Sequence, residues 1–255
     1  MAGLRARFDQ AATGSRSRDL ARARYTQDLM QADPTGSRYW DRVASEKTFS
    51  HPIDAELLRP RIPAEARILD LGCGYGRTLA ELADLGYRDA VGVDTSAGMI
   101  ARGRSQFPDL DLRTVEPGPL PFEAERFDLV LLFAVLTSTT NNTAQQALVA
   151  ELGRVLSPGG SIYVSDLWIQ ADPRNTSRYA AAQQSLSPDS TEPYGVFETA
   201  DGGRFRHHTR KWIQSLFKTF DGIAAQDQAF TTMNGNRAQG FQHLYRKARR
   251  PSLPD

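Results

Sequence analysis

Cysteine and long apolar runs are both scarce in this 255-residue sequence, whose only cysteine is Cys73. A lone cysteine excludes an intramolecular disulfide and any metal cluster built from several cysteines, so we expect no metal site. No apolar run approaches the roughly 18 residues that span a bilayer. The first residues also lack the apolar segment of a secretory signal. These absences predict a cytoplasmic protein with no membrane partner.

An excess of charge of either sign is also missing. The sequence has 31 basic and 30 acidic side chains, a formal net charge of +1. Proteins with a large nucleic-acid footprint usually show a basic excess, so the balance argues against a nucleic-acid partner. Aliphatic and aromatic residues make up 40% of the chain, which is enough for a core. The length fits one large α/β domain, or one domain with a small cap, as a monomer or a homodimer.

The segment Arg67–Thr78 (RILDLGCGYGRT) organises the chain. Its short apolar run, Arg67–Leu71, is typical of a buried parallel strand. Glycines then alternate through a turn at Gly72, Gly74 and Gly76, and helical spacing of apolar residues follows in Arg77–Leu85. Glycines permit φ > 0 and let a ligand lie directly on the main chain. The unit therefore predicts a ligand site at a strand–turn–helix junction, with Cys73 as a small residue of the turn.

The spacing of these glycines separates two classes of cofactor. Dinucleotide sites use G-x-G-x-x-G and face a pyrophosphate. This chain has G-x-G-x-G, with Asp70 two residues before the first glycine. A carboxylate suits a ligand with an ammonium group and repels a pyrophosphate. The segment resembles motif I of the class I S-adenosylmethionine (SAM) dependent methyltransferases, which implies SAM as cofactor, S-adenosylhomocysteine as product, and Asp70 as partner of the methionine ammonium.

A second acid lies at the end of the next predicted strand. The strand Asp89–Asp94 ends 18 residues after Gly76. The two carboxylate oxygens of Asp94 match the two hydroxyls of a ribose, a device that NAD enzymes share. Thr95 then begins a helix that contains Met99. Met99 belongs either to the core or to a contact with adenine or ribose.

Two later strand ends supply further candidate cofactor contacts. Glu116 follows the predicted strand Leu110–Val115, and it resembles the family's acid that receives the adenine amino group. The next residue in that family donates its backbone N–H to adenine, whereas Pro117 has none. Glu116 therefore contacts adenine or belongs to a polar surface loop. The apolar run Arg126–Leu136 indicates a central parallel strand, which places Phe133 at the pocket.

The order of the remaining elements predicts the fold. The helix Gln145–Leu156, the turn at Pro158–Gly160 and the strand Ser161–Leu167 resemble the family's crossover between its fourth and fifth strands. The runs Ile223–Phe230 and Gly240–Tyr245 indicate a β-hairpin. We therefore expect an α/β, doubly wound, Rossmann-like, seven-stranded and mostly parallel sheet with a C-terminal antiparallel hairpin.

Composition divides the chain into parts. We expect an N-terminal arm and helical lid over residues 1–60, a SAM-binding domain over 61–248 with a polar insertion at 169–205, and a tail at 249–255. The first 24 residues carry six arginines against two aspartates, which suits a transit peptide, an anionic partner or a solvated arm. Aromatic residues before a cofactor-binding strand often form a lid, which makes Trp40 a candidate cofactor contact.

Three histidines are candidate catalytic bases. His51 precedes Pro52 at an expected turn, and His207 and His208 precede the helix Lys211–Phe220, for which Thr209 is the expected cap. Adjacent histidines point in different directions on a regular element and are poor co-ligands for one metal ion. A single histidine near pH 7 is a sensible general base. Each of the three also suits an ordinary structural role.

The resemblance extends to a bacterial subgroup of the methyltransferases whose members mostly lack an assigned substrate. The chain resembles this subgroup at Trp40–Asp41, at Phe49–Pro52 and at Arg206–Thr209. The implied reaction is in-line attack by an O, N, S or C atom of a small molecule on the sulfonium methyl. The motif Asp/Asn-Pro-Pro-aromatic of enzymes that methylate base amino groups is missing. Alternatives are an NAD(P) oxidoreductase, a SAM-binding protein without methyl transfer, and a nucleic-acid methyltransferase.

Overall fold

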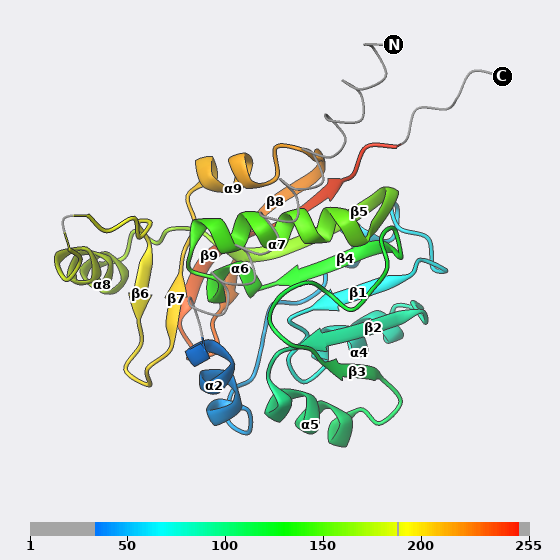
Figure 1. The fold of residues 1–255 in the computed structure, drawn as a ribbon, viewed down its shortest axis with the longest axis horizontal. Coiled ribbons are helices and arrows are strands. Elements are labelled where there is room, and N and C mark those ends of the chain that lie inside the picture. Colours follow the sequence, from blue (N-terminus) through cyan, green and yellow to red (C-terminus); the bar gives the residue numbers. More distant parts are fainter. Residues whose placement is uncertain (1–33, 188, 250–255) are drawn as a thin grey trace, which may run out of the picture.

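The computed structural model describes residues 34–187 and 189–249, which form a seven-stranded sheet covered by helices on both faces (Figure 1). The strand order is β3-β2-β1-β4-β5-β9-β8. The strands are β1 (Ile68–Leu71), β2 (Ala90–Asp94), β3 (Asp111–Thr114), β4 (Phe127–Phe133), β5 (Leu156–Leu167), β8 (Asp221–Thr231) and β9 (Arg237–Arg246). The first five pair with one another in parallel, and β9 is antiparallel to both β5 and β8. The predicted fold, including the terminal hairpin, is confirmed.

Helices bury apolar side chains against the two faces of this sheet. On one face lie α7 (Asn142–Val155) and α9 (Arg210–Leu216), whose core residues include Leu152 and Ile213. On the other face lie α3 (Ala55–Leu58) and α4 (Arg77–Asp84), with Leu82 fully buried. The helix α5 (Ala97–Gln106) packs beside α4 through Ile100. Predicted caps are present, since the Thr209 side chain accepts the Trp212 N–H at the start of α9.

Chain reversal at the centre of the sheet creates the site. The strand β1 pairs with β2 on one side and with β4 on the other. The chain therefore continues from β1 to β2 and β3 on one side, and then crosses to β4 and β5 on the other side. All four residues of β1 are buried, as expected for a strand covered on both faces. In such sheets ligands bind beyond the carboxyl ends of the strands at this switch point.

The central strand is shorter than the sequence predicts. The run Arg126–Leu136 was expected to be one strand, but β4 ends at Phe133. Ala134 follows with φ of 55°, and Val135–Ser138 form the short helix α6. Apolar content alone does not separate a strand from the buried helix that follows it. As a result, the segment after Phe133 turns across the carboxyl edge of the sheet instead of extending it.

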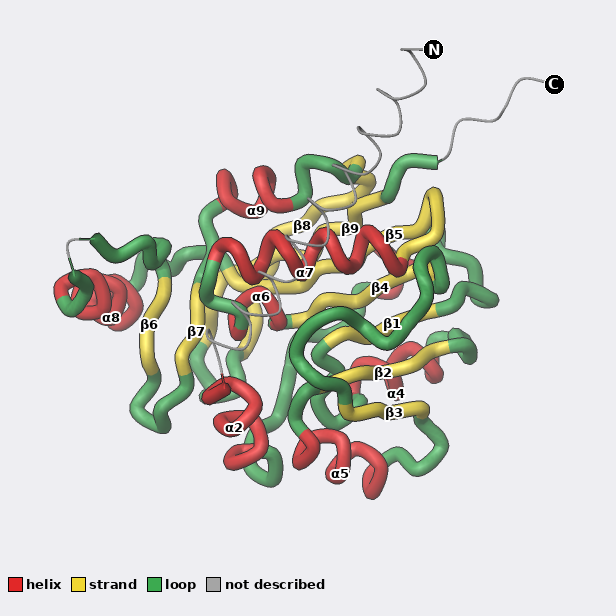
Figure 2. The backbone as a smooth tube through the Cα atoms, in the orientation of Figure 1, coloured by secondary structure: helices red, strands yellow, loops and turns green. Residues whose placement is uncertain are grey.

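The segment predicted as an insertion has regular structure of its own. It contains α8 (Pro173–Gln184) and the strands β6 (Val196–Glu198) and β7 (Arg204–Arg206), which form a separate antiparallel pair. Figure 2 shows these elements beyond the end of the main sheet. They pack on α2 (Pro34–Val43), where Tyr39, Phe197 and Phe205 share one buried cluster. The predicted lid and insertion therefore form one cap.

The Arg-rich residues 1–24 and most of the predicted tail lie outside the described residues. In the part of the chain that the structure describes, no helix combines the length and the apolar character needed to cross a membrane.

Candidate functional site

A cavity of about 750 Å³ lies between the carboxyl ends of the central strands and the cap. Most residues predicted for the site line it: Trp40, His51, Asp70, Gly72, Cys73, Gly74, Asp94, Thr95, Met99, Glu116, Pro117, Phe133 and His207. Gly76 and His208 do not. The cavity volume is in the range of small-molecule and cofactor sites.

The glycine turn presents bare main chain to this cavity. Gly74 has φ of +54°, and a Cβ atom there would lie 2.5 Å from Cε2 of Phe49. Glycine is therefore required both for the backbone conformation and for the approach of the aromatic ring. Gly76 differs, because its φ of +84° caps α4 and an added Cβ would meet Leu112. Its predicted role in giving a ligand access to the backbone is wrong, and Gly76 instead shapes the turn.

Asp94 connects the glycine turn to the next helix. Its Oδ2 accepts the N–H of Gly74 at 2.8 Å, and its Oδ1 accepts the N–H of Ser96 at 2.8 Å. Burial raises the pKa of Asp94, whereas these two N–H groups lower it. Each carboxylate oxygen keeps a lone pair for another donor. The carboxylate is thus held at the cavity wall in a fixed orientation, as a ribose contact requires.

Asp70 is a buried carboxyl with an unsatisfied oxygen. The residue is 1% exposed, and Oδ2 has no hydrogen-bond partner among the described residues. Burial raises the pKa of Asp70 to about 8, while the positive charge of Arg77 opposes the shift. Arg77, which the sequence analysis missed, also lines the cavity and has a buried, unpartnered Nε. Together they offer an acceptor for an ammonium group and a donor for a carboxylate.

An aromatic wall closes the cavity on the cap side. The ring of Trp40 packs edge-on against those of Phe49 and Phe205, with centroids 5.7 and 5.9 Å away. The neighbouring Asp41 connects this wall to the start of α5, because its Oδ1 accepts from Ser96 Oγ at 2.6 Å. The sequence signal for this contact was the Trp-Asp pair, but nothing in it identified Ser96 as the partner.

The remaining predicted cofactor contacts line the cavity with unequal burial. Met99 is 1% exposed, so it lies in the core at the cavity edge, while Thr95 and Glu116 are exposed. Pro117 lies beside Glu116 in the wall and has no N–H to donate. Phe133 is half-buried and packs edge-on against Tyr163 at 4.9 Å.

His51 enters the cavity from the segment before α3. Its Nδ1 lies 3.1 Å from Ser165 Oγ, and its ring stacks on Phe230 with centroids 4.0 Å apart. Burial lowers the pKa of His51 to about 4, so the imidazole is neutral near pH 7. Within the described ranges, Nε2 has no hydrogen-bond partner. A neutral, rigidly held imidazole at the wall suits proton abstraction if Nδ1 carries the proton.

His207 carries its proton on the ring nitrogen Nε2. The Tyr179 hydroxyl accepts the Gln170 N–H at 3.3 Å and lies 2.5 Å from His207 Nδ1. No other acceptor for that hydroxyl occurs in residues 34–187 or 189–249, so it donates to Nδ1. Burial lowers the pKa of His207 to about 3, and the neutral ring therefore carries its proton on Nε2. This corrects its prediction as a base, because the ring offers an N–H donor.

His208 is also not placed to act as a base. It is 1% exposed and lies behind the cavity wall. Its Nε2 is 2.9 Å from Gln145 Nε2, and its Nδ1 is 3.5 Å from Asp166 Oδ1. Asp166 in turn accepts the N–H groups of Thr137 and Leu167. His208 thus joins β5 to α7 in a structural network. The described residues also contain no group of three or more side chains suited to a metal ion.

Comparison with known proteins agrees with this geometry. Residues 68–160 match the family model described as a methyltransferase domain. A demethylmenaquinone methyltransferase of Beutenbergia cavernae is 37% identical over 39% of this chain and 40% of its own length. A trans-aconitate 2-methyltransferase of Methylobacterium nodulans is 34% identical over 49% of this chain and 48% of its own length. The match thus spans less than half of either relative.

A solved structure extends the likeness to most of the chain. A SAM-dependent methyltransferase from Methanosarcina mazei superposes with a TM-score of 0.70 at 22% identity, over 78% of this chain and all of that one. Residues 68–160 are thus similar to a methyltransferase domain, and most of the chain shares the fold of that solved structure. The name of that solved protein specifies SAM, and the buried Asp70 oxygen without a partner and the bare backbone at Gly74 fit the amino-acid part of this cofactor.

Proposed function

We propose that the chain transfers a methyl group from SAM to a nucleophilic O, N, S or C atom of a small molecule. The observation that carries this proposal is the single cavity that joins the acidic glycine turn to His51 and His207. SAM, when bound, supplies a methyl group already activated by its sulfonium. The chain therefore contributes mainly positioning and exclusion of water, and good orientation is worth on the order of 7–11 kcal/mol.

The residues have separate roles in this proposal. Asp70 and Arg77 hold the amino-acid part of SAM, and Asp94 holds the ribose. Glu116 is the candidate adenine contact, and Trp40 covers the cofactor from the cap. Where the nucleophile of the methyl acceptor must lose a proton, His51 accepts that proton. His207 donates a hydrogen bond to the methyl acceptor. The two relatives support a small-molecule acceptor, because their names specify demethylmenaquinone and trans-aconitate.

Calorimetric titration with S-adenosylhomocysteine tests the cofactor assignment. We expect micromolar binding by the full chain, no binding of NAD, and a loss of about tenfold or more in Asp94→Ala. Formation of S-adenosylhomocysteine from SAM across a panel of small acceptors then tests turnover. Binding without turnover on any acceptor would favour a SAM-binding protein without methyl transfer. Failure of folded protein to bind S-adenosylhomocysteine would overturn the proposal.

A further inference from the structure

Two arginines of α8 bring positive charge to the cavity. Arg174 and Arg178 lie one turn apart on α8, and both line the cavity. The guanidinium of Arg178 lies 4.6 Å from the centroid of the Phe197 ring, and within the described residues it makes no ion pair. Burial, together with the charge of Arg174, lowers the pKa of Arg178. A half-buried cation without a carboxylate partner is costly, which suggests that a ligand supplies the partner.

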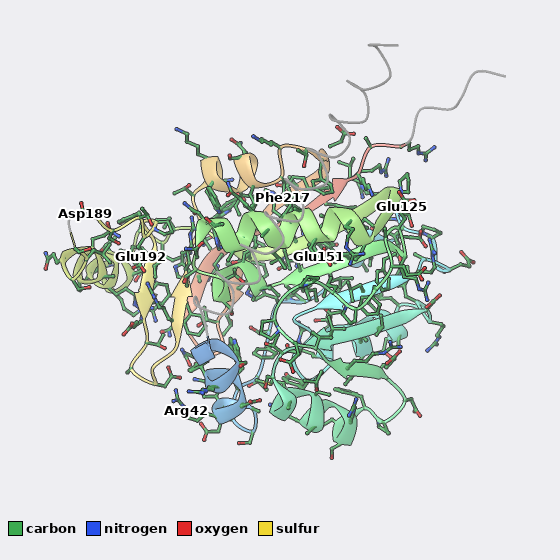
Figure 3. The ribbon with its side chains drawn as sticks, in the orientation of Figure 1. Arg42, Glu125, Glu151, Asp189, Glu192 and Phe217 are labelled. Atoms are coloured by element: carbon green, nitrogen blue, oxygen red, sulfur yellow. The ribbon has the colours of Figure 1, made fainter. Side chains whose placement is uncertain are left out.

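Nearby carboxylates in residues 34–187 and 189–249 leave Arg178 without an ion-pair partner. The closest to Arg174 belongs to Asp172, with a 3.9 Å separation. Asp172 already caps α8, because its two oxygens accept the N–H and the side-chain amide of Asn175. Glu192, labelled beside β6 in Figure 3, is paired with Arg204. Among the described residues, Arg178 therefore has no carboxylate partner, and Arg174 has only the long contact with Asp172.

Uncharged polar groups also line this cavity. The Phe197 ring contacts both Arg178 and His207, and its centroid is 4.8 Å from that of the imidazole. Since Tyr179 fixes the proton of His207 on Nε2, that nitrogen adds an N–H donor to the residues that line the same cavity. Asn175 is fully buried, lines the cavity, and has no partner for its Oδ1. The Asn175 Oδ1 accepts hydrogen bonds, so a ligand would have to supply a separate donor to it.

The other half of the cavity has the opposite charge. Asp70, Asp94 and Glu116 line the cofactor side. SAM carries two positive groups and one carboxylate, so its net charge complements these acids. The cavity is thus divided into an acidic half for a cationic cofactor and a basic half for something else.

We propose that the methyl acceptor carries an oxyanion, a carboxylate or a phosphate group, that binds Arg178 and Arg174 on α8 with His207 donating an additional hydrogen bond. This inference rests on the proposed function, since it names the substrate class of the same cavity. The planar guanidinium can form two parallel hydrogen bonds with either anion, whereas a lysine ammonium acts as a point charge. This geometry favours arginine over lysine for binding an oxyanion. The oxyanion anchors one end of the acceptor and leaves its nucleophile free to face the cofactor.

The test uses the full chain saturated with S-adenosylhomocysteine and titrated by ligand-detected NMR. The probes are glutarate, inorganic phosphate, and glutaramide as the neutral counterpart of glutarate. Variants are Arg178→Gln, Arg178→Lys and, as a matched control, Arg210→Gln, whose side chain is exposed and paired with Asp227 outside the cavity. Calorimetry with S-adenosylhomocysteine on every variant verifies beforehand that the cofactor half is intact.

We expect glutarate or phosphate to bind the wild type and to bind about tenfold more weakly in Arg178→Gln. Arg178→Lys should recover part of the affinity, Arg210→Gln should match the wild type, and glutaramide should not bind. Comparison of glutarate with phosphate identifies which anion is preferred. Equal anion affinity in Arg178→Gln and wild type, equal binding of glutaramide, or binding of neither anion would overturn the inference. Absent S-adenosylhomocysteine binding would instead overturn the proposed function.

Discussion

The carboxylate of Asp94 accepts the backbone N–H of Gly74 across a 2.8 Å contact that joins the ends of β2 and β1. The contact orients the acid and fixes the glycine turn at the same time. A substitution in the turn should therefore disturb both the fold and the cofactor site.

Gly74→Ala tests this coupling. An alanine here would have to keep φ of +54°, and its Cβ would lie 2.5 Å from the Phe49 ring. We therefore expect a loss of about 2 kcal/mol or more in unfolding free energy. S-adenosylhomocysteine binding should fall with it. Gly86→Ala is the matched control, because Gly86 has φ of +99° but nothing within 4 Å of an added Cβ. It should cost about 1 kcal/mol and leave binding intact. Equal losses in the two variants by chemical denaturation would contradict the explanation.

Asp70 should couple cofactor binding to proton release. With its pKa at about 8, the carboxyl is mostly protonated at pH 7 in the free protein. A ligand ammonium favours the carboxylate, so binding should release about one proton and the affinity should rise as the pH increases from 6 to 8. Calorimetry at pH 7 in buffers of different ionisation enthalpy measures this number.

Asp70→Asn should abolish the proton release while Asp111→Asn, an exposed residue paired with Arg113, should preserve it. An unchanged heat of binding in all buffers for the wild type would show that Asp70 is already ionised.

The two cavity histidines should respond differently to replacement. Once an acceptor is identified, His51→Gln should lower kcat by about 10²–10⁴ if the nucleophile must lose a proton. His207→Gln should mainly raise KM, because it removes a hydrogen-bond donor to the acceptor. His243→Gln, outside the cavity, should match the wild type.

The pH profile gives a second measure of the role of His51. Its pKa of about 4 means that the base is lost only when the pH falls through about 4. The rate should thus show no histidine-dependent change between pH 6 and 8. A rate that falls with a midpoint near 6.5, and only when His51 is present, would argue against the lowered pKa.

Gln145 should be a large contributor to the stability of the wall behind the site. Its fully buried amide donates to the carbonyls of Leu136 and Thr139, and its Oε1 accepts from Trp212 Nε1 at 2.6 Å. Gln145→Leu leaves these groups unsatisfied and should cost about 2–3 kcal/mol in thermal or chemical unfolding. The neighbouring Gln146 is exposed, so Gln146→Leu should change stability by less than about 0.5 kcal/mol. Similar losses for both would contradict the assigned network.

The site residues that follow a strand were predictable because the chain places them locally. Asp70 and Asp94 lie at or near the ends of apolar runs, and the carboxyl ends of parallel strands meet at one edge. The prediction of one strand through Leu136 was wrong, because it rested on local apolar content alone. Apolar content does not record that Ala134 takes a positive φ and starts α6.

The sequence by itself determined the fold class, the order of the strands and the residues of the glycine turn and strand ends that line one part of the cavity. Hydrophobic period, turn residues and one glycine spacing carry that information over short distances. Only the tertiary structure decided which histidine faces the cavity as a possible base, since Tyr179 sets the proton of His207 and Gln145 holds His208. It likewise decided that α8 closes the site with Arg174 and Arg178, because contacts between distant segments leave no period in the sequence.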